Sequence, residues 1–220
     1  MLRGKRLNLL FVITATLYIL TIPLELNTLD PLLKVIPLLV LFTAAYGQLS
    51  GNIRLLGIMA IVLCACGDVL LTQSFDHSFV YGLGAFVVGH IFYSVAFLQF
   101  ANKQFFTAKI IMAIILLCTT IGLAMIILPA TESLLIPVST YVGIITSMVV
   151  IAVFAWSKSM VHIGGAIMFM ISDTILAWNM FLDPLPFAVI GIMLTYYIAQ
   201  FCMVAGLIKL FTDRQIHSSL

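Results

Sequence analysis

Eight long apolar runs occupy almost the whole of this 220-residue chain. A helix needs about 20 apolar residues to cross a bilayer, and each run has roughly that length. The runs lack the period-two alternation of outer-membrane strands, so they predict helices. The expected spans are 7–24, 35–49, 54–73, 79–100, 108–128, 134–155, 161–181 and 187–210. The sequence therefore predicts an all-α integral membrane protein, an eight-transmembrane-helix bundle that forms a single domain over residues 1–220.

The scarcity of charge excludes the other broad classes. Charged residues make up 8% of the chain, whereas soluble domains carry about 25%. A soluble surface cannot be covered with so few charges, and disorder needs the opposite composition of low hydrophobicity and high charge. A disulfide-stapled secreted domain is also excluded, because all four cysteines fall inside apolar runs (Cys64, Cys66, Cys118 and Cys202).

The distribution of charge predicts the orientation of the bundle. Nine basic residues precede, follow or connect the spans on one side: Arg3, Lys5, Arg6, Arg54, Lys103, Lys109, Lys158, Lys209 and Arg214. The other side has one basic residue and five acidic ones: Lys34, Glu25, Asp30, Asp76, Glu132 and Asp183. Basic residues accumulate in cytoplasmic loops, so both termini are expected in the cytoplasm, with the first span retained. In a bacterial host the membrane would be the inner, cytoplasmic membrane.

A short repeated pattern suggests two parallel halves. Span 54–73 contains Gly67-Asp68 and span 161–181 contains Ser172-Asp173, each followed by an aliphatic tail. The helix after each carries an aromatic and polar cluster. This favours four-helix half-repeats over residues 1–105 and 106–220, with chance similarity between apolar helices as the alternative.

Two acidic residues lie inside spans rather than in loops. Counted along their helices, Asp68 lies about 21 Å and Asp173 about 18 Å from the inner surface. Insertion of a carboxylate at such depth costs a few kcal/mol, so a functional role is the first hypothesis. Counted from the outer surface, His90, Tyr196 and Gln200 reach a similar depth. The five side chains are therefore candidates for one shared pocket, which we expect to open toward the outer half of the membrane.

Helical spacing adds further candidates to this pocket. His90 and Tyr93 are three residues apart and share a helix face, and Tyr196 and Gln200 are four apart. Tyr197 and Lys34 are the remaining candidates for binding or orienting a substrate. The alternatives are structural: the tyrosines and Gln200 as interhelical hydrogen bonders, His90 in a similar role, and Lys34 reaching only to the outer interface.

Two buried carboxylates can divide the roles of acid and base, which suits hydrolysis through an oxocarbenium-like state. No Gly-x-Ser-x-Gly motif indicates a serine hydrolase. Zinc catalysis needs about three ligands, and His90 is the only imidazole deep in a span, so neither a metal nor another cofactor is expected. A proton-coupled small-molecule or lipid transporter is the competing class, because intramembrane acids and parallel repeats also occur in carriers.

The two motif-bearing segments together resemble the YhhN-like family. The residues that carry the resemblance are Gly67–Leu71 with Gly84–Tyr93, and Gly165–Asp173 with Thr195–Gln200. The resemblance covers essentially the whole chain, with the same eight-span layout. The family includes the animal transmembrane lysoplasmalogenases. It also tends to have a Lys closely followed by Pro at the start of the second span, whereas here Val35 and Ile36 separate Lys34 from Pro37.

The resemblance implies an integral-membrane hydrolase that cleaves the sn-1 vinyl-ether bond of lysoplasmalogens. The products would be a fatty aldehyde and a glycerophospho-base. It also implies that Asp68 and Asp173 form the catalytic centre. Lysophospholipid substrate and membrane lipids are the expected partners, with no nucleic acid and no particular oligomeric state.

Overall fold

The computed structural model describes residues 5–24 and 29–218, and within them the chain folds into eight long α-helices. Two 3-10 segments, η1 (Ile22–Leu24) and η2 (Leu128–Leu134), extend α1 and join α5 to α6. The helices are α1 (Lys5–Thr21), α2 (Asp30–Gln48), α3 (Gly51–Leu71), α4 (Ser78–Leu98), α5 (Phe106–Ile127), α6 (Leu135–Phe154), α7 (Val161–Phe181) and α8 (Ala188–Ser218). All eight can cross a membrane by length and apolarity, which confirms the predicted bundle: the chain is a multi-pass integral membrane protein.

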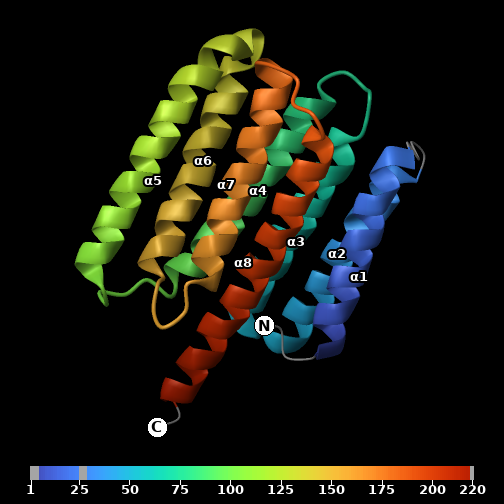
Figure 1. Ribbon diagram of the computed structural model, residues 1–220. Helices are drawn as coiled ribbons and strands as arrows, with labels where there is room; N and C mark the ends of the chain where they lie inside the picture. Colours follow the sequence, from blue (N-terminus) through green and yellow to red (C-terminus); the bar gives the residue numbers. More distant parts are fainter. Residues whose placement is uncertain (1–4, 25–28, 219–220) are drawn as a thin grey trace.

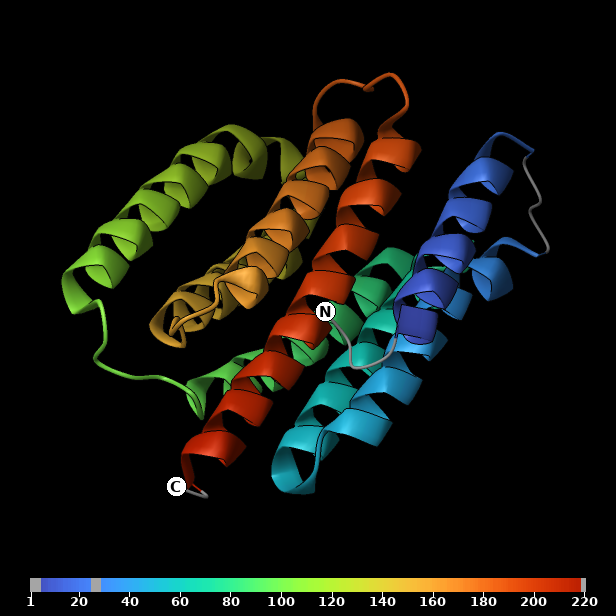
Figure 2. The same cartoon turned by 60° about the horizontal axis from the view of Figure 1, so that its bottom comes forward.

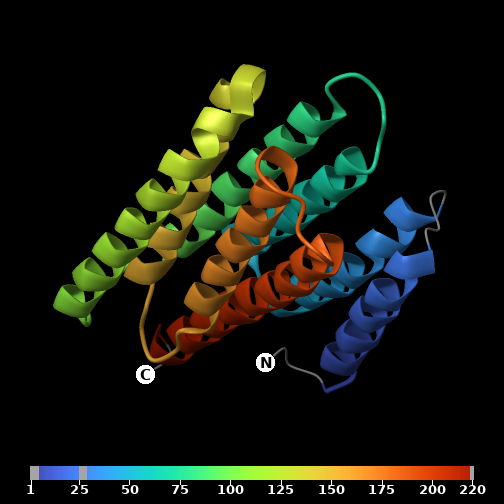
Figure 3. The ribbon, with the colours of Figure 1, turned by 45° about the horizontal axis from the view of Figure 1, so that its top comes forward.

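Successive helices run in opposite directions, so the bundle has two distinct ends (Figure 1). At the proximal end, α1 begins, α8 ends and the connections α2–α3, α4–α5 and α6–α7 lie. The distal end carries the connections α1–α2, α3–α4, α5–α6 and α7–α8, which Figure 3 brings forward. Arg3 and Glu25, two of the residues used to predict orientation, lie outside the described residues. The cytoplasmic location of the proximal end stays a prediction.

Within the described residues, six helices form a closed ring of neighbours. In this ring α2 packs on α3, α3 on α4, α4 on α6, α6 on α7, α7 on α8, and α8 returns to α2. The remaining two helices pack outside the ring, α1 against α2 and α8, and α5 against α6 and α7. Figure 2 shows α1 and α5 on opposite flanks of the bundle. Side chains of the ring helices therefore meet in a common interior.

Small residues allow two of these helix pairs to approach closely. A Cβ atom placed on Gly89 of α4 would lie 3.3 Å from the carbonyl oxygen of Ala60 in α3. A Cβ atom on Gly165 of α7 would lie 2.9 Å from the carbonyl oxygen of Ala199 in α8. The close crossings occur in α3–α4 and α7–α8, the helix pairs that carry the repeated sequence pattern. The duplication itself stays a prediction.

Two helices are longer than the sequence predicted. α2 begins at Asp30 rather than at 35, because Pro31 fits the first turn of a helix and an acidic residue is favourable at the helix N-terminus. α8 continues to Ser218 rather than ending near 210. No Gly or Pro interrupts it there, and the guanidinium of Arg214 donates a hydrogen bond to the carbonyl oxygen of Gln99 at 3.2 Å. Helical structure thus extends beyond the apolar run.

Lys109 was expected at the proximal margin of span 108–128, and it lies in the first turn of α5 with its side chain fully buried. Its ammonium donates to the backbone and side-chain oxygens of Asn102, at 2.9 and 2.8 Å, and to the carbonyl oxygen of Phe154 at 3.0 Å. Phe154 ends α6, where carbonyl groups lack partners within the helix. Lys109 therefore joins α5, the α4–α5 connection and the end of α6.

Replacing Lys109 with Met is expected to lower the free energy of unfolding by about 2 kcal/mol, because three partly buried acceptors lose a charged donor. The measurement is thermal unfolding of the purified protein in detergent. Lys103→Met is the matched control. Lys103 is exposed in the α4–α5 connection, and its loss should change the free energy of unfolding by less than about 0.5 kcal/mol. Equal shifts in the two variants would contradict this role of Lys109.

Candidate active site

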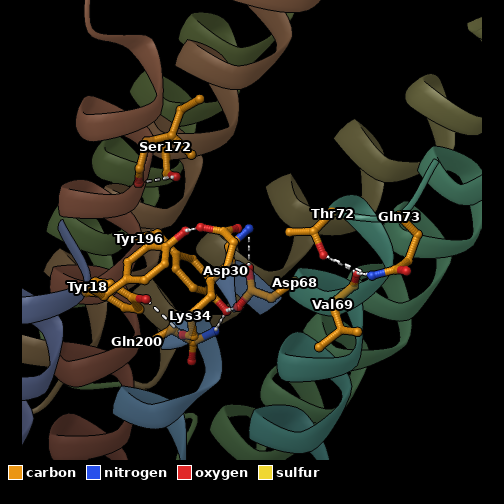
Figure 4. A network of polar contacts seen from close by, with 12 residues as sticks. Tyr18, Asp30, Lys34, Asp68, Val69, Thr72, Gln73, Ser172, Tyr196 and Gln200 are labelled. Carbon is orange, nitrogen blue, oxygen red and sulfur yellow. Dashed lines mark hydrogen bonds and ion pairs between the residues drawn. The ribbon is translucent and has the colours of Figure 1, made fainter. Parts of the chain in front are cut away.

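Asp68 lies in α3 and is buried among side chains from two other helices. The ammonium of Lys34, from α2, lies 3.3 Å from Asp68 Oδ1. The hydroxyl of Tyr196, from α8, donates a hydrogen bond of 2.6 Å to Asp68 Oδ2. Figure 4 shows these side chains converging. Each carboxylate oxygen of Asp68 thus has its own partner, and one of the two partners is a cation.

Asp173 lies in α7 and has a different environment. The hydroxyl of Tyr141, from α6, donates to Asp173 Oδ2 at 2.6 Å. Within residues 5–24 and 29–218, Asp173 forms no ion pair, whereas Asp68 pairs with Lys34. Two carboxylates of the same chemical type therefore have unequal surroundings. Such inequality is how paired carboxylates come to serve as acid and base.

Both carboxylates line one cavity of about 630 Å³. Every helix of the bundle contributes to its wall. The charged groups come from α2, α3 and α7, while the part of the wall that α5 and α6 contribute is mostly aliphatic: Leu123, Ala124, Ile127, Val138, Val142 and Ile145. The cavity extends to residues at the distal ends of the helices, including Thr72, Phe181 and Val189. Its volume and largely apolar lining suit an amphiphilic ligand.

The two carboxylates lie at different distances from the distal ends of their own helices. Asp68 is three residues before the distal end of α3, about 4.5 Å along the helix. Asp173 is eight residues before the distal end of α7, about 12 Å along the helix. Measured against α8, Ser172 donates to the carbonyl oxygen of Ile192, whereas Asp68 accepts from Tyr196, one turn further from the distal end, so one bound ligand can contact both carboxylates.

Of the predicted orienting residues, Lys34 and Tyr196 line the cavity with the two Asp, and the other four do not. Tyr93 donates to Gln200 Oε1 at 2.8 Å, and Gln200 Nε2 donates to the Tyr196 hydroxyl at 3.4 Å. Tyr197 donates to the carbonyl oxygen of Lys34 at 2.8 Å. Gln200 and Tyr197 thus bond to Tyr196 and Lys34, and Tyr93 bonds to Gln200. These three side chains position the two cavity residues and do not themselves line the cavity.

His90 is fully buried next to the cavity wall. Its ring packs edge-on against Phe169 and Tyr141, with ring centroids 4.5 and 5.5 Å away, and it also contacts Phe86. Neither ring nitrogen has a hydrogen-bond partner. His90 therefore borders Tyr141, which holds Asp173, but it does not itself line the cavity.

Among the polar side chains that line the cavity, sequence reasoning missed Tyr141, Asp30 and Tyr18. Tyr141 gave a usable signal, because it lies inside span 134–155, but one tyrosine in an apolar span resembles ordinary packing. Asp30 was assigned to a loop, yet it lies in the first turn of α2 and lines the cavity. Tyr18 of α1 also lines the cavity and donates to Asp30 Oδ1 at 3.1 Å.

The arrangement supports proton transfer to and from one bound molecule. A cation 3.3 Å away stabilises the ionised form of Asp68. Asp173 lacks such a cation within the described residues, so the ionised form of Asp68 is the more strongly stabilised of the two. No three carboxylate, imidazole or thiol groups of residues 5–24 and 29–218 gather as a metal-binding set. Catalysis without a metal stays a prediction.

Comparison with known proteins gives a consistent set of matches. The model of the YhhN family matches residues 29–207. The chain is 29% identical over 206 residues to the lysoplasmalogenase TMEM86B of Mus musculus, which covers 90% of this chain and 85% of that protein. The TMEM86B lysoplasmalogenase of Sus scrofa is 31% identical over 205 residues, covering 90% and 84%. The lysoplasmalogenase of Mycobacterium tuberculosis is 28% identical over 182 residues, covering 81% and 70%. No solved structure matches the chain.

Proposed function

Because the chain belongs to the YhhN family, we propose that it is a lysoplasmalogenase, an integral-membrane hydrolase of the sn-1 vinyl-ether bond of lysoplasmalogens. Membership confirms the resemblance that the sequence motifs predicted. The activity is proposed from the relatives, which carry that name and match most of this chain. The observation that carries the proposal here is the pair of unequal carboxylates in one largely apolar cavity.

Asp173 is the general acid in this proposal. A vinyl ether is hydrolysed by protonation of its β-carbon, which produces an oxocarbenium ion. Among the described residues, Asp173 is the carboxylate of the pair without a cationic partner, so it is the one assigned to carry the proton. The Tyr141 hydroxyl holds its other oxygen in place.

Asp68 is the base and the group that stabilises the cation. Its carboxylate faces the oxocarbenium ion and accepts a proton from the water that adds to the α-carbon. The resulting hemiacetal collapses when Asp68 returns this proton to the leaving sn-1 oxygen and the Asp173 carboxylate accepts the hydroxyl proton. One water is consumed, and both Asp return to their starting forms. Lys34 and Tyr196 hold Asp68 in position throughout.

The test is turnover by the purified protein in detergent, without a membrane gradient. A 1-alkenyl lysophospholipid should release fatty aldehyde, whereas the matched 1-alkyl lipid, which lacks the double bond, should be unchanged. In D₂O, aldehyde that is reduced immediately should contain one deuterium at the former β-carbon, because the acid protonates that carbon. Absence of aldehyde would overturn the proposed activity, and a transporter would give this result because it moves its substrate without breaking a covalent bond.

A further inference from the structure

Asp30 is a charged cavity residue that the proposed chemistry does not use. It lies at the distal end of α2, lines the cavity wall and accepts a hydrogen bond from the Tyr18 hydroxyl at 3.1 Å through Oδ1. A carboxylate has about four acceptor sites on its two oxygens, so this contact leaves most of its capacity available. Asp30 thus places a negative charge at the distal side of the site.

Lys34 lies one helical turn further into the cavity. Residues four apart on a helix share a face, with Cβ atoms about 5–6 Å apart. The ammonium of Lys34 contacts Asp68, but an ammonium has three donors and this contact uses one. Asp30 and Lys34 of α2 and Asp68 of α3 therefore place negative, positive and negative groups close together at the cavity (Figure 4).

We propose that Asp30 and Lys34 form a subsite for a zwitterionic head group, with the phosphate at Lys34 and the terminal ammonium at Asp30 and Tyr18. This rests on the proposed function, which supplies a lysophospholipid as the ligand. In such a lipid the ammonium, the phosphate and the sn-1 bond follow one another along the molecule. Asp30 lies at the distal end of α2, and Lys34, one turn further in, contacts the catalytic Asp68. The subsite selects lipids with an amine in the head group over lipids without one.

The test compares two lipids that the enzyme cannot hydrolyse and that differ in one charge. They are 1-O-hexadecyl-sn-glycero-3-phosphoethanolamine and its N-acetyl derivative, whose binding to the full chain in nonionic micelles is measured by calorimetry. The protein should bind the amine lipid about tenfold more tightly, because a charged group gains a charged partner. Asp30→Asn should reduce this ratio to about twofold or less, and Tyr18→Phe should reduce it partly.

Asp76→Asn is the matched control, because Asp76 carries the same charge at the same end of the bundle but is exposed and does not line the cavity. In Asp76→Asn, the ratio of the affinities for the amine lipid and its N-acetyl derivative should equal that of the unmodified protein. Lys34→Met should weaken both lipids alike, since both retain the phosphate. If Asp30 were purely structural, its replacement would lower the affinities for the two lipids by the same factor.

Equal affinity of the unmodified protein for the two lipids would overturn the subsite, and so would an undiminished ratio in Asp30→Asn. The affinities of the unmodified protein test the subsite even if a variant fails to fold. The proposed function is tested separately by aldehyde release, so binding selectivity without turnover would reject the hydrolase and retain the subsite. Turnover without binding selectivity would retain the hydrolase and reject the subsite.

Discussion

Replacing Asp173 with Asn is expected to lower kcat for aldehyde release by about a thousandfold. The amide has the same shape but cannot donate a proton to carbon, and general acid–base groups typically contribute about 10²–10⁴ in rate. Asp68→Asn should cause a loss of at least about a hundredfold, because the cation loses its carboxylate and the attacking water loses its base. The measurement is the initial rate of aldehyde release from a 1-alkenyl lysophospholipid.

Asp183→Asn is the control for both variants. It makes the same chemical change in the exposed α7–α8 connection, outside the cavity, so the rate should remain normal. Each variant protein should elute as the same species as the unmodified protein, which separates loss of chemistry from loss of folding. Near-normal rates in both cavity variants would show that the two Asp are structural.

The second large effect is expected from Gly165→Ala. The added Cβ atom would lie 2.7 Å from the backbone nitrogen of Met203 and 2.9 Å from the carbonyl oxygen of Ala199. Backbone atoms cannot move aside as a flexible side chain can, so α7 and α8 must separate, at a cost of about 1–3 kcal/mol. The measurement is the apparent Tm in detergent, which should fall clearly. Activity should also fall, because α7 carries Asp173 and α8 carries Tyr196.

The neighbouring residue provides the control for this change. A Cβ atom on Gly164 would meet nothing within 4 Å. Gly164→Ala should therefore leave the Tm unchanged or raise it slightly, since Ala is favoured over Gly inside a helix by about 1 kcal/mol. If the two substitutions changed the Tm equally, the close approach of α7 and α8 would be refuted.

The number and order of the helices could be predicted from sequence because a bilayer imposes a simple rule of length and apolarity. The same rule identified Asp68 and Asp173, since a carboxylate is costly inside a span. The rule fails at helix ends. It placed Lys34 just before span 35–49, whereas Lys34 lies within α2, because a helix can include a charged residue once its side chain finds a partner.

The pairing of side chains could not be predicted from one sequence. Tyr196 and Asp68 are 128 residues apart, and only the closed ring of helices brings them within hydrogen-bonding distance. The same holds for Tyr141, whose role depends on its facing Asp173 across the α6–α7 contact. Helical spacing grouped His90 with Tyr93 correctly on one face, but it could not show which part of that face borders the cavity.

The division of the cavity into a charged wall and an aliphatic wall has a consequence for what happens after hydrolysis. Cleavage at the boundary between the walls would split an amphiphile into two molecules of opposite solubility. The glycerophospho-base would leave from the charged side into water, and the aldehyde would remain among the aliphatic side chains of α5 and α6. The bilayer is then the reservoir for one product, and its dilution there would help to draw the reaction forward. Turnover should therefore increase when more lipid is supplied per protein at constant substrate density.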